Sequence, residues 1–431
     1  MLSWEFPPNL VGGLSRHVDN LSRALVGRGV EVDVLTTSYP GAPPLEEIGG
    51  VRVHRVPPYF SNAPDFPSWV MHANFGFLEE GARLVGANGP ADLVHAHDWL
   101  VTYAARGLKH LYQVPLVATI HATEHGRHNG VHSPQQKYIN DIEWWLTYEA
   151  WRVISCSRYM KDEVRRLFGL PEDKVRVVPN GVNLPVEPRK TDGVDGTAPR
   201  AVDPSKQAAG PRPRSRFAHP AEKIIFHVGR LVPEKGAGLL LEALPMILAA
   251  RPEVKLIVAG TGPWAEELRY RARSAGIEHK VYLTGFLDDA TVSALYRWAE
   301  VAVFPSYYEP FGIVALEGMA AGTPVVVSDV GGLSEIVEHD VDGLKALPGN
   351  ARSLADQILR ILGEPGLKER LARAALDKIR RQYLWERVAA LTEKVYREVL
   401  NERSRTTWVE PKPVAARVAP IGRYTEARAS H

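Results

Sequence analysis

The sequence contains a single cysteine, Cys156, among its 431 residues, and it has no long hydrophobic run. One cysteine excludes an intrachain disulfide, and no cluster of Cys and His indicates a structural zinc site. No apolar stretch approaches the roughly 20 residues that a membrane span needs, and the N-terminus lacks the basic-then-apolar pattern of a signal peptide. The formal net charge of +2 gives no reason to expect nucleic-acid binding. We therefore predict a cytoplasmic protein without a membrane span.

Length and hydrophobic patterning predict two α/β domains. A chain of 431 residues exceeds what one core usually fills, so two domains of roughly 200 residues each are expected. Short apolar runs alternate with amphipathic segments, a pattern typical of parallel sheets covered on both faces by helices. The predicted strands are residues 51–56, 93–96, 116–120, 153–156, 175–178, 224–228, 256–259, 281–284, 301–304 and 325–328. The predicted helices include residues 14–28, 138–151, 239–250 and 265–275.

Composition divides the chain further. Residues 187–220 are rich in Pro, Arg, Lys, Asp and Gly and show no periodicity, so they cannot bury enough apolar surface to become ordered. The predicted parts are an N-terminal Rossmann-like domain over 1–184, a disordered interdomain linker over 185–220, a C-terminal Rossmann-like domain over 221–382, a helix over 383–403 that packs back towards the N-terminal domain, and a polar tail over 404–431.

Two glutamates eight residues apart, Glu309 and Glu317, mark a predicted strand–loop–helix junction. The apolar run 301–304 ends at Pro305, and a helix opens near Gly312. Glu309 then lies just ahead of a helix N-terminus, where free N–H groups attract anions and a carboxylate accepts hydroxyl protons. Such an array suits a sugar and its phosphate. An equally open alternative is that Glu309 only caps the helix and Glu317 is solvated.

Glycines and cations follow other predicted strands. In doubly wound domains, ligands bind in the cleft at the carboxyl ends of the strands. Gly12 and Gly13 precede the first helix, so the backbone there can approach a ligand closely. Arg230 and Lys235 follow the strand at 224–228 and are five residues apart, so both can reach a diphosphate. We predict a ligand site in this cleft.

An ordered set of motifs runs through both predicted domains. It consists of Gly12-Gly13, Gly229-Arg230 with Lys235, Gly260-Thr261-Gly262-Pro263, the segment from Glu309 to Glu317, and Gly331-Gly332 with Glu335. This set resembles that of the retaining nucleotide-sugar glycosyltransferases of family 4, from about residue 3 to about residue 347. The resemblance implies the GT-B fold, in which two doubly wound Rossmann-like α/β domains face each other across a cleft. Three further segments are similar to glycogen and starch synthases: Trp4-Glu5-Phe6-Pro7-Pro8, Val11-Gly12-Gly13-Leu14 and His95-Ala96-His97-Asp98-Trp99.

The resemblance implies that the C-terminal domain binds the nucleotide-sugar donor without a metal ion or other cofactor. Arg230 and Lys235 would neutralise the departing diphosphate, as a metal ion does in other transferases. Glu317 would accept hydrogen bonds from the ribose hydroxyls, and Glu309 from the transferred sugar. The other donor-binding positions that it implies are Gly12 and Gly13 of the N-terminal domain, with Gly262, Phe311, Gly312 and Ile313.

The N-terminal domain is implied to hold the acceptor. His121 matches the family histidine that contacts the donor sugar and the reaction centre, and His125 and Arg127 would form the site wall. In this family the acceptor is thought to attack the donor sugar from the same face from which the leaving group departs. Glu309 is therefore predicted to stabilise the sugar and not to act as a nucleophile. An aromatic ring can stack on a sugar and a carboxylate can accept its hydroxyl protons. The predicted acceptor-side residues are His97, Asp98 and Trp99.

The implied activity is retaining transfer of glucose from ADP-glucose or UDP-glucose to an α-1,4-glucan, as in a glycogen synthase. The alternatives are a family 4 transferase with a trehalose-type, lipid-linked or small-molecule acceptor, and a nucleotide-sugar epimerase. One departure from the synthases is Leu10, because they usually carry Lys directly before Val-Gly-Gly-Leu. No nucleic-acid partner is expected, and no feature indicates an oligomeric state.

Two remaining motifs receive structural interpretations. Asp340 and Asp342 spell an acid-x-acid pair, but they precede Gly343 in an apparent turn, which predicts solvent exposure instead of a metal site. A group of tryptophans at helical spacing is predicted to be core and not a carbohydrate platform: Trp144, Trp145 and Trp151.

Overall fold

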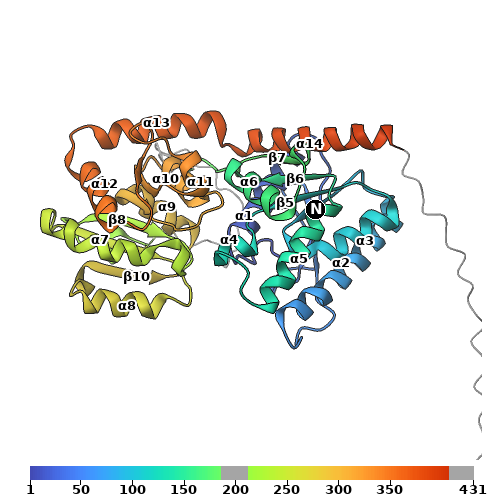
Figure 1. The fold of residues 1–431 in the computed structure, drawn as a ribbon, viewed down its shortest axis with the longest axis horizontal. Coiled ribbons are helices and arrows are strands. Elements are labelled where there is room, and N and C mark those ends of the chain that lie inside the picture. Colours follow the sequence, from blue (N-terminus) through green and yellow to red (C-terminus); the bar gives the residue numbers. More distant parts are fainter. Residues whose placement is uncertain (186–211, 407–431) are drawn as a thin grey trace, which may run out of the picture.

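The chain forms two α/β lobes that lie side by side (Figure 1). A computed structural model describes residues 1–185 and 212–406. Most of the predicted linker and most of the predicted polar tail therefore lie outside the described residues. Within the two described ranges, no helix is both long enough and apolar enough to cross a membrane.

The N-terminal lobe is built on a largely parallel sheet in two halves. One half has the strand order β4-β5-β6-β7 and the other the order β1-β3-β2, in which only β2 is antiparallel. Leu2 joins the halves, because it forms parallel bridges to both Leu35 and Ala96. The strands are β1 (Asp33–Thr37), β2 (Leu45–Ile48), β3 (Val51–Val56), β4 (Val94–His97), β5 (Leu116–Ile120), β6 (Arg152–Ser155) and β7 (Val175–Val177).

The C-terminal lobe is built on one six-stranded sheet with the order β10-β9-β8-β11-β12-β13. All its pairings are parallel, and its central strands are apolar runs with buried side chains, as expected for a sheet covered on both faces. The strands are β8 (Lys223–Val228), β9 (Val254–Ala259), β10 (Val281–Gly285), β11 (Ala299–Phe304), β12 (Val325–Ser328) and β13 (Leu344–Ala346).

Helices cover both sheets, and several begin at a side-chain cap. Asp65, Ser133 and Ser157 each accept a hydrogen bond from a backbone N–H in the first turn of the following helix. The N-terminal lobe contains α1 (Gly13–Val26), α2 (Phe66–Asn88), α3 (Thr102–Tyr112), α4 (Glu124–His128), α5 (Pro134–Glu149) and α6 (Arg158–Phe168). The C-terminal lobe contains α7 (Ala237–Ala250), α8 (Ala265–Ser274), α9 (Asp289–Trp298), α10 (Ile313–Ala320), α11 (Gly331–Ile336), α12 (Ala351–Gly363) and α13 (Leu367–Gln382).

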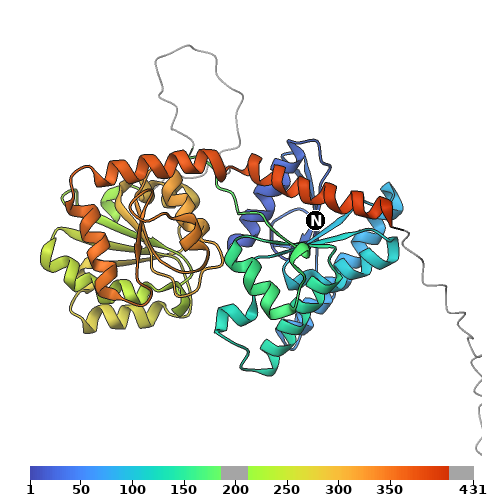
Figure 2. The ribbon, with the colours of Figure 1, turned by 45° about the horizontal axis from the view of Figure 1, so that its top comes forward.

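The last described helix, α14 (Trp385–Arg405), leaves the C-terminal lobe and lies along the N-terminal lobe (Figure 2). It packs against α1, and its apolar side chains share one buried cluster with those of α1 and of β1 and β3. Just before α14, where the chain passes back to the N-terminal lobe, the Tyr383 carbonyl oxygen accepts a hydrogen bond of 2.8 Å from the Val182 N–H. The helix thus belongs by contact to the lobe at the opposite end of the sequence.

Every predicted strand is present, with ends shifted by at most two residues. The sequence interpretation missed β1, β2 and β13. Residues of β2 alternate between exposed and half-buried positions at the sheet edge, so they form no apolar run. β1 begins at Asp33, whose charge interrupts the pattern, and β13 is only three residues long.

The prediction of a disordered linker as far as residue 220 is wrong for its last part. Residues 214–216 form a 3₁₀ turn, and Phe217 and Ala218 are buried. The Phe217 ring lies 6.0 Å from that of Tyr282 on β10, so this segment anchors itself through one aromatic side chain. A single buried ring in a polar stretch leaves no periodic signal in the sequence.

The structural interpretations of the acid pair and the tryptophans are partly wrong. Asp342 is buried, and its carboxylate accepts hydrogen bonds from Lys378 Nζ and from the Glu338 N–H, both at 2.8 Å. Asp340 is half-exposed and pairs with Arg360. Trp144 is 45% exposed and stacks on Tyr148, whereas Trp145 and Trp151 are half-buried. Both acids are therefore paired with basic side chains.

Candidate active site between the lobes

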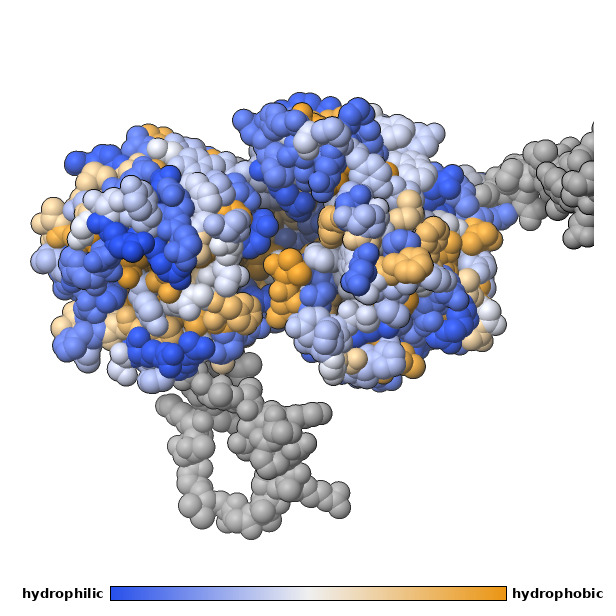
Figure 3. Space-filling model, turned by 90° about the horizontal axis from the view of Figure 1, so that it is seen from below, coloured by the Kyte–Doolittle hydropathy of each residue, from blue (hydrophilic) through white to orange (hydrophobic). Residues whose placement is uncertain are grey.

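The two lobes meet where the carboxyl ends of their parallel strands face each other, and a recess is visible between them (Figure 3). The contacts across it are specific. Ser157 Oγ donates a hydrogen bond of 2.7 Å to the Pro310 carbonyl oxygen. Glu335 on α11 accepts hydrogen bonds of 3.0 and 2.7 Å from the N–H groups of Arg158 and Tyr159 at the start of α6. The loop between β11 and α10 is therefore held against the N-terminal lobe.

Glu309 lies in this loop and is paired with Lys235. Lys235 Nζ donates a hydrogen bond of 2.7 Å to Glu309 Oε2, and Ser306 Oγ donates one of 3.3 Å to the same oxygen. The Glu309 side chain is 9% exposed and that of Lys235 is 22% exposed, so the pair is largely sheltered from water. The structure thus brings together one predicted cation and one predicted sugar ligand. Glu309 does not cap α10, because no side-chain cap hydrogen bond is present at the start of that helix.

Arg230 follows β8 on the neighbouring loop, and its side chain is half exposed. Its nearest carboxylate is that of Glu234, at 3.5 Å. The loop itself is fixed by glycine: a Cβ on Gly260 would lie 1.9 Å from the Gly229 carbonyl oxygen, and one on Gly262 would lie 2.3 Å from that of Leu231. These two glycines let the loops after β8 and β9 pack backbone against backbone, which places Arg230 at the strand end.

Glu317 on α10 is partly buried, and residues from both lobes contact it. Arg16 Nη1 on α1 donates a hydrogen bond of 3.1 Å to Glu317 Oε1, and the Tyr296 hydroxyl donates one of 3.3 Å to Oε2. Burial raises the pKa of the Glu317 carboxyl, and the neighbouring guanidinium of Arg16 opposes this. Arg16 also pairs with Asp289. The alternative of a solvated Glu317 is therefore wrong, and sequence reasoning missed Arg16 as its partner.

The turn with the paired glycines already binds a carboxylate. Glu5 Oε2 accepts hydrogen bonds of 2.7 Å from the Val11 N–H and 3.3 Å from the Gly12 N–H. A Cβ on Gly13 would lie 3.2 Å from the Ile313 side chain of the other lobe, so only a small residue fits this approach. Burial raises the pKa of Glu5. The turn that is predicted to face the donor phosphates therefore has backbone N–H groups that bind an anionic group, the carboxylate of Glu5.

The predicted acceptor side centres on histidines at the ends of β4 and β5. His97 Nδ1 and His121 Nε2 are 3.2 Å apart. Burial, together with the nearby charge of Arg127, lowers the pKa of His121 to about 3, so the ring is neutral at physiological pH. Burial also lowers the pKa of His97 well below its usual value. These neutral rings can donate and accept hydrogen bonds but carry no charge.

Asp98 and Trp99 lie behind these histidines. Asp98 Oδ1 accepts a hydrogen bond of 2.7 Å from the His121 N–H, and burial raises the pKa of this carboxyl to about 6. Asp98 therefore holds the His121 backbone in place. Trp99 is 3% exposed and its ring lies edge-on to Phe66, so it supports the wall and offers no open face to a sugar.

Glu143 on α5 is a buried carboxyl behind this wall, and both its oxygens accept from the Glu124 N–H. Burial raises its pKa to about 8, which means that folding favours the protonated form. This contribution to stability is fully present below about pH 4.5 and is lost as the pH rises through 8.

We expect Glu143→Gln to have near-wild-type stability at pH 5 and to be more stable than the wild type by on the order of 3 kcal/mol at pH 9. Urea unfolding at both pH values measures this, with the exposed Glu278→Gln as control; an equal effect at both pH values would contradict it.

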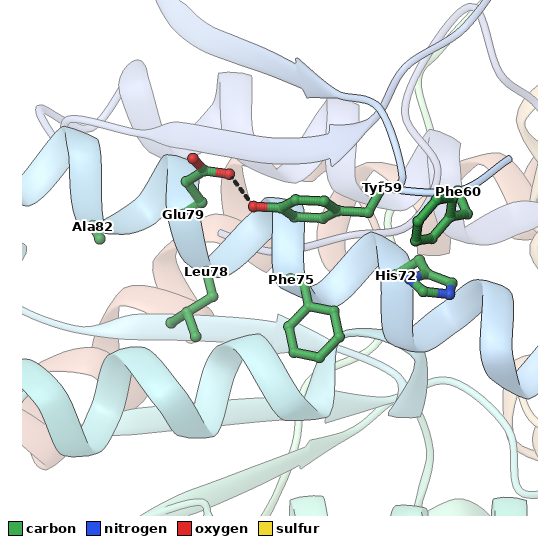
Figure 4. A pocket seen from close by; sticks show the side chains of 7 residues that line it. All are labelled: Tyr59, Phe60, His72, Phe75, Leu78, Glu79 and Ala82. Atoms are coloured by element: carbon green, nitrogen blue, oxygen red, sulfur yellow. Dashed lines mark hydrogen bonds between the residues drawn. The ribbon is translucent and has the colours of Figure 1, made fainter. Parts of the chain in front are cut away.

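A separate cavity of about 440 Å³ lies on the outer side of α2 (Figure 4). It contains none of the predicted site residues. The Tyr59 hydroxyl donates a hydrogen bond to Glu79 across it, and the Phe60 ring lies against that of His72. The cavity is lined by Tyr59, Phe60, His72, Phe75, Leu78, Glu79 and Ala82. Because the predicted site residues gather in the recess between the lobes, that recess is the candidate active site.

Sequence comparison identifies the family. Residues 11–185 match the pattern described as Glycosyltransferase Family 4, and residues 212–378 match the pattern described as Glycosyl transferases group 1. A glycosyltransferase of Methanocaldococcus jannaschii is 40% identical over 94% of this chain and 99% of its own length. The chain belongs to the family 4 glycosyltransferases.

The names of other similar proteins differ from one another. The glycogen synthase of Mycobacterium tuberculosis is 37% identical over 92% of this chain and 93% of its own length. A D-inositol 3-phosphate glycosyltransferase of Xylanimonas cellulosilytica is 31% identical, with 91% and 93% covered. Sucrose-phosphate synthase from Thermosynechococcus elongatus is a similar solved structure, with a TM-score of 0.72, 26% identity, and 91% and 94% covered. The present chain therefore has the predicted GT-B fold. Its membership of a glycosyltransferase family sets aside the epimerase alternative.

Proposed function

We propose that this family 4 enzyme is a retaining hexosyltransferase that moves glucose from ADP-glucose or UDP-glucose to an α-1,4-glucan. The observation that carries the proposal is the Lys235–Glu309 pair, which lies with Arg230 at the strand ends of the C-terminal lobe. The 37% identity to a glycogen synthase supports the glucan acceptor. We further propose that the enzyme acts in the cytoplasm, where its one thiol, the buried Cys156, would stay reduced.

In the proposed reaction the bond between the glucose C1 and the β-phosphate oxygen breaks, and a bond from C1 to an acceptor hydroxyl oxygen forms on the same face. The acceptor proton passes to the departing phosphate oxygen. Arg230 and Lys235 stabilise the negative charge that develops on the diphosphate. Glu309 accepts hydroxyl hydrogen bonds from the glucose and faces the positive charge that develops on its ring. His121, neutral and held by Asp98, contacts the glucose from the other lobe.

Donor binding also requires a rearrangement at Glu317. For this carboxylate to accept hydrogen bonds from the ribose, Arg16 must share or release it. Arg16 lies one turn into α1, next to the turn of Gly12 and Gly13, so the released guanidinium would be beside the donor phosphates. It would there supply a cation close to Leu10, the position at which the synthases usually carry Lys.

A phosphorylated small sugar is the second candidate acceptor, and Arg127 favours it. Arg127 on α4 acts electrostatically on Asp98 and His121, so its positive charge lies on the acceptor side. Its charge also acts on the buried carboxyl of Glu143, and an anionic acceptor that binds on this side would face the same charge. The D-inositol 3-phosphate glycosyltransferases among the relatives support this candidate.

A donor-by-acceptor screen with nucleotide release as readout separates the candidates. The donors are ADP-glucose and UDP-glucose, and the acceptors are glycogen, maltooligosaccharides, inositol phosphate and phosphorylated hexoses. We expect elongation of glycogen or maltooligosaccharides with α-1,4 linkage. Transfer only to phosphorylated acceptors, with loss of that transfer in Arg127→Ala, would establish the second candidate and overturn the glucan proposal.

Transfer should persist in excess chelator, because fixed cations take the place of a divalent ion at the diphosphate. The measurement is the rate of nucleotide release with and without EDTA, using enzyme that has first been dialysed against chelator. Complete loss of activity that magnesium or manganese restores would overturn the role given to Arg230 and Lys235.

A further inference from the structure

Three histidines from distant parts of the sequence converge in the N-terminal lobe. His17 comes from α1, His97 ends β4 and His121 follows β5. One ring nitrogen from each lies within 4.8 Å of the other two. The rings of His17 and His121 are 4.6 Å apart between centroids, and His97 Nδ1 is 3.2 Å from His121 Nε2. The side chains thus direct several nitrogens at one small volume.

This cluster contains polar atoms that the rest of the described chain does not satisfy. Both ring nitrogens of His17 and Nε2 of His97 are buried and have no hydrogen-bond partner. His17 is 4% exposed and His97 is fully buried. An unpaired buried nitrogen costs folding free energy, so a ligand that binds it would be favoured. Burial also keeps the rings neutral, and neutral imidazole is the form that binds a metal ion.

We propose that His17, His97 and His121 form a binding site for a divalent transition-metal ion, with zinc the best fit. Zinc bound at three histidines typically has a fourth position open to water or substrate. The ligand set consists of nitrogens only, which favours zinc over magnesium or calcium. His121 is half-buried, so the open position would face the recess between the lobes.

The geometry needs only small ring movements. Tetrahedral zinc with bonds of about 2.0 to 2.1 Å places its ligand nitrogens roughly 3.4 Å apart. The His97–His121 separation of 3.2 Å already matches this edge. The other separations must shorten from at most 4.8 Å, which rotation of the rings can supply. Asn180 Oδ1 is buried, lacks a partner and lies beside His17, so it can accept the remaining ring N–H of that ligand.

A metal ion in this site would inhibit the transferase. It would occupy the His121 nitrogen that is proposed to contact the donor glucose. This consequence rests on the proposed function, whereas metal binding itself does not. An inhibitory metal site also agrees with the prediction that transfer persists in chelator, because chelation would remove the inhibitor.

Zinc binding to the full-length protein tests the site directly. Equilibrium dialysis against zinc chloride should find one tightly bound ion per chain, and His17→Asn and His97→Asn should each weaken this binding by about 10-fold or more. His279→Asn, at an exposed histidine in the C-terminal lobe, should bind zinc as the wild type does. Cobalt substitution should give the intense visible absorption of a tetrahedral ion, and His17→Asn should abolish it.

The outcomes are separable. No stoichiometric zinc in the wild type, or equal binding by the wild type and both cluster variants, would overturn the site. Circular dichroism and thermal melting check that each variant is folded, and an unfolded His17→Asn leaves His97→Asn to decide. For activity, each protein is compared with its own metal-free rate: zinc should inhibit the wild type and not His17→Asn. Zinc that binds at the cluster without inhibiting transfer would support the site but overturn the role proposed for His121.

Discussion

Lys235→Ala should lower turnover by about 100-fold or more, because loss of one preorganised charge at a developing anion typically costs roughly 3 kcal/mol. The structure adds a second reason. Lys235 Nζ is 2.7 Å from Glu309 Oε2, so its removal also leaves a largely buried carboxylate without its counter-charge. The measurement is kcat for nucleotide release at saturating donor. Arg230→Ala should show a similar loss of turnover, but with little effect on stability, because its side chain is half exposed.

Lys255→Ala is the matched control, since Lys255 is a lysine on β9 of the same lobe whose ammonium group bonds only a backbone carbonyl, that of His279, in the described structure. It should retain wild-type turnover. Thermal melting separates a lost charge from a lost fold. If folded Lys235→Ala and Arg230→Ala both keep near-wild-type activity, neither residue binds the departing diphosphate.

Gly260→Ala should destabilise the C-terminal lobe by about 4 kcal/mol or more, which is in the range of the most damaging single substitutions. Its φ of +131° is disfavoured for alanine, and the new Cβ would lie 1.9 Å from the backbone oxygen of Gly229. Backbone cannot move aside as a flexible side chain can. Because Gly229 directly precedes Arg230, any variant that still folds should also lose activity. Urea unfolding and nucleotide release measure the two effects.

Gly276→Ala isolates the conformational part of this effect. Gly276 also has a positive φ, +68°, but an added Cβ there would meet nothing within 4 Å. Alanine at this position should therefore cost only about 1 kcal/mol. Similar losses of stability at the two positions would show that the contact with Gly229 is not what requires glycine at 260.

Much of the fold could be predicted from the sequence because buried parallel strands are continuous apolar runs. The central strands β8, β9 and β11 are recognisable for this reason. β2 could not be found in the same way, because an antiparallel edge strand that is half solvated carries no such run. Phe217 was missed because one buried ring in a polar segment has no pattern around it.

The candidate site was predicted only as far as local motifs extend. Glu309 and Lys235 were proposed separately, yet their contact joins residues 74 positions apart and is a product of the fold. Arg16 gave no signal, because its partner Glu317 lies 301 positions away in the other lobe. The histidine cluster is a similar case: no metal-ligand spacing exists in the sequence, since His17, His97 and His121 meet only when α1 packs beside β4 and β5.

The return of α14 to the N-terminal lobe means that this lobe can be completed only late in synthesis. Val388, Val395 and Val399 of α14 share a buried cluster with Leu21 and Leu25 of α1. Chains emerge from the ribosome N-terminus first, and domains generally fold as units as they appear. Here the first lobe stays incomplete, with the apolar face of α1 exposed, until the last described helix has been made.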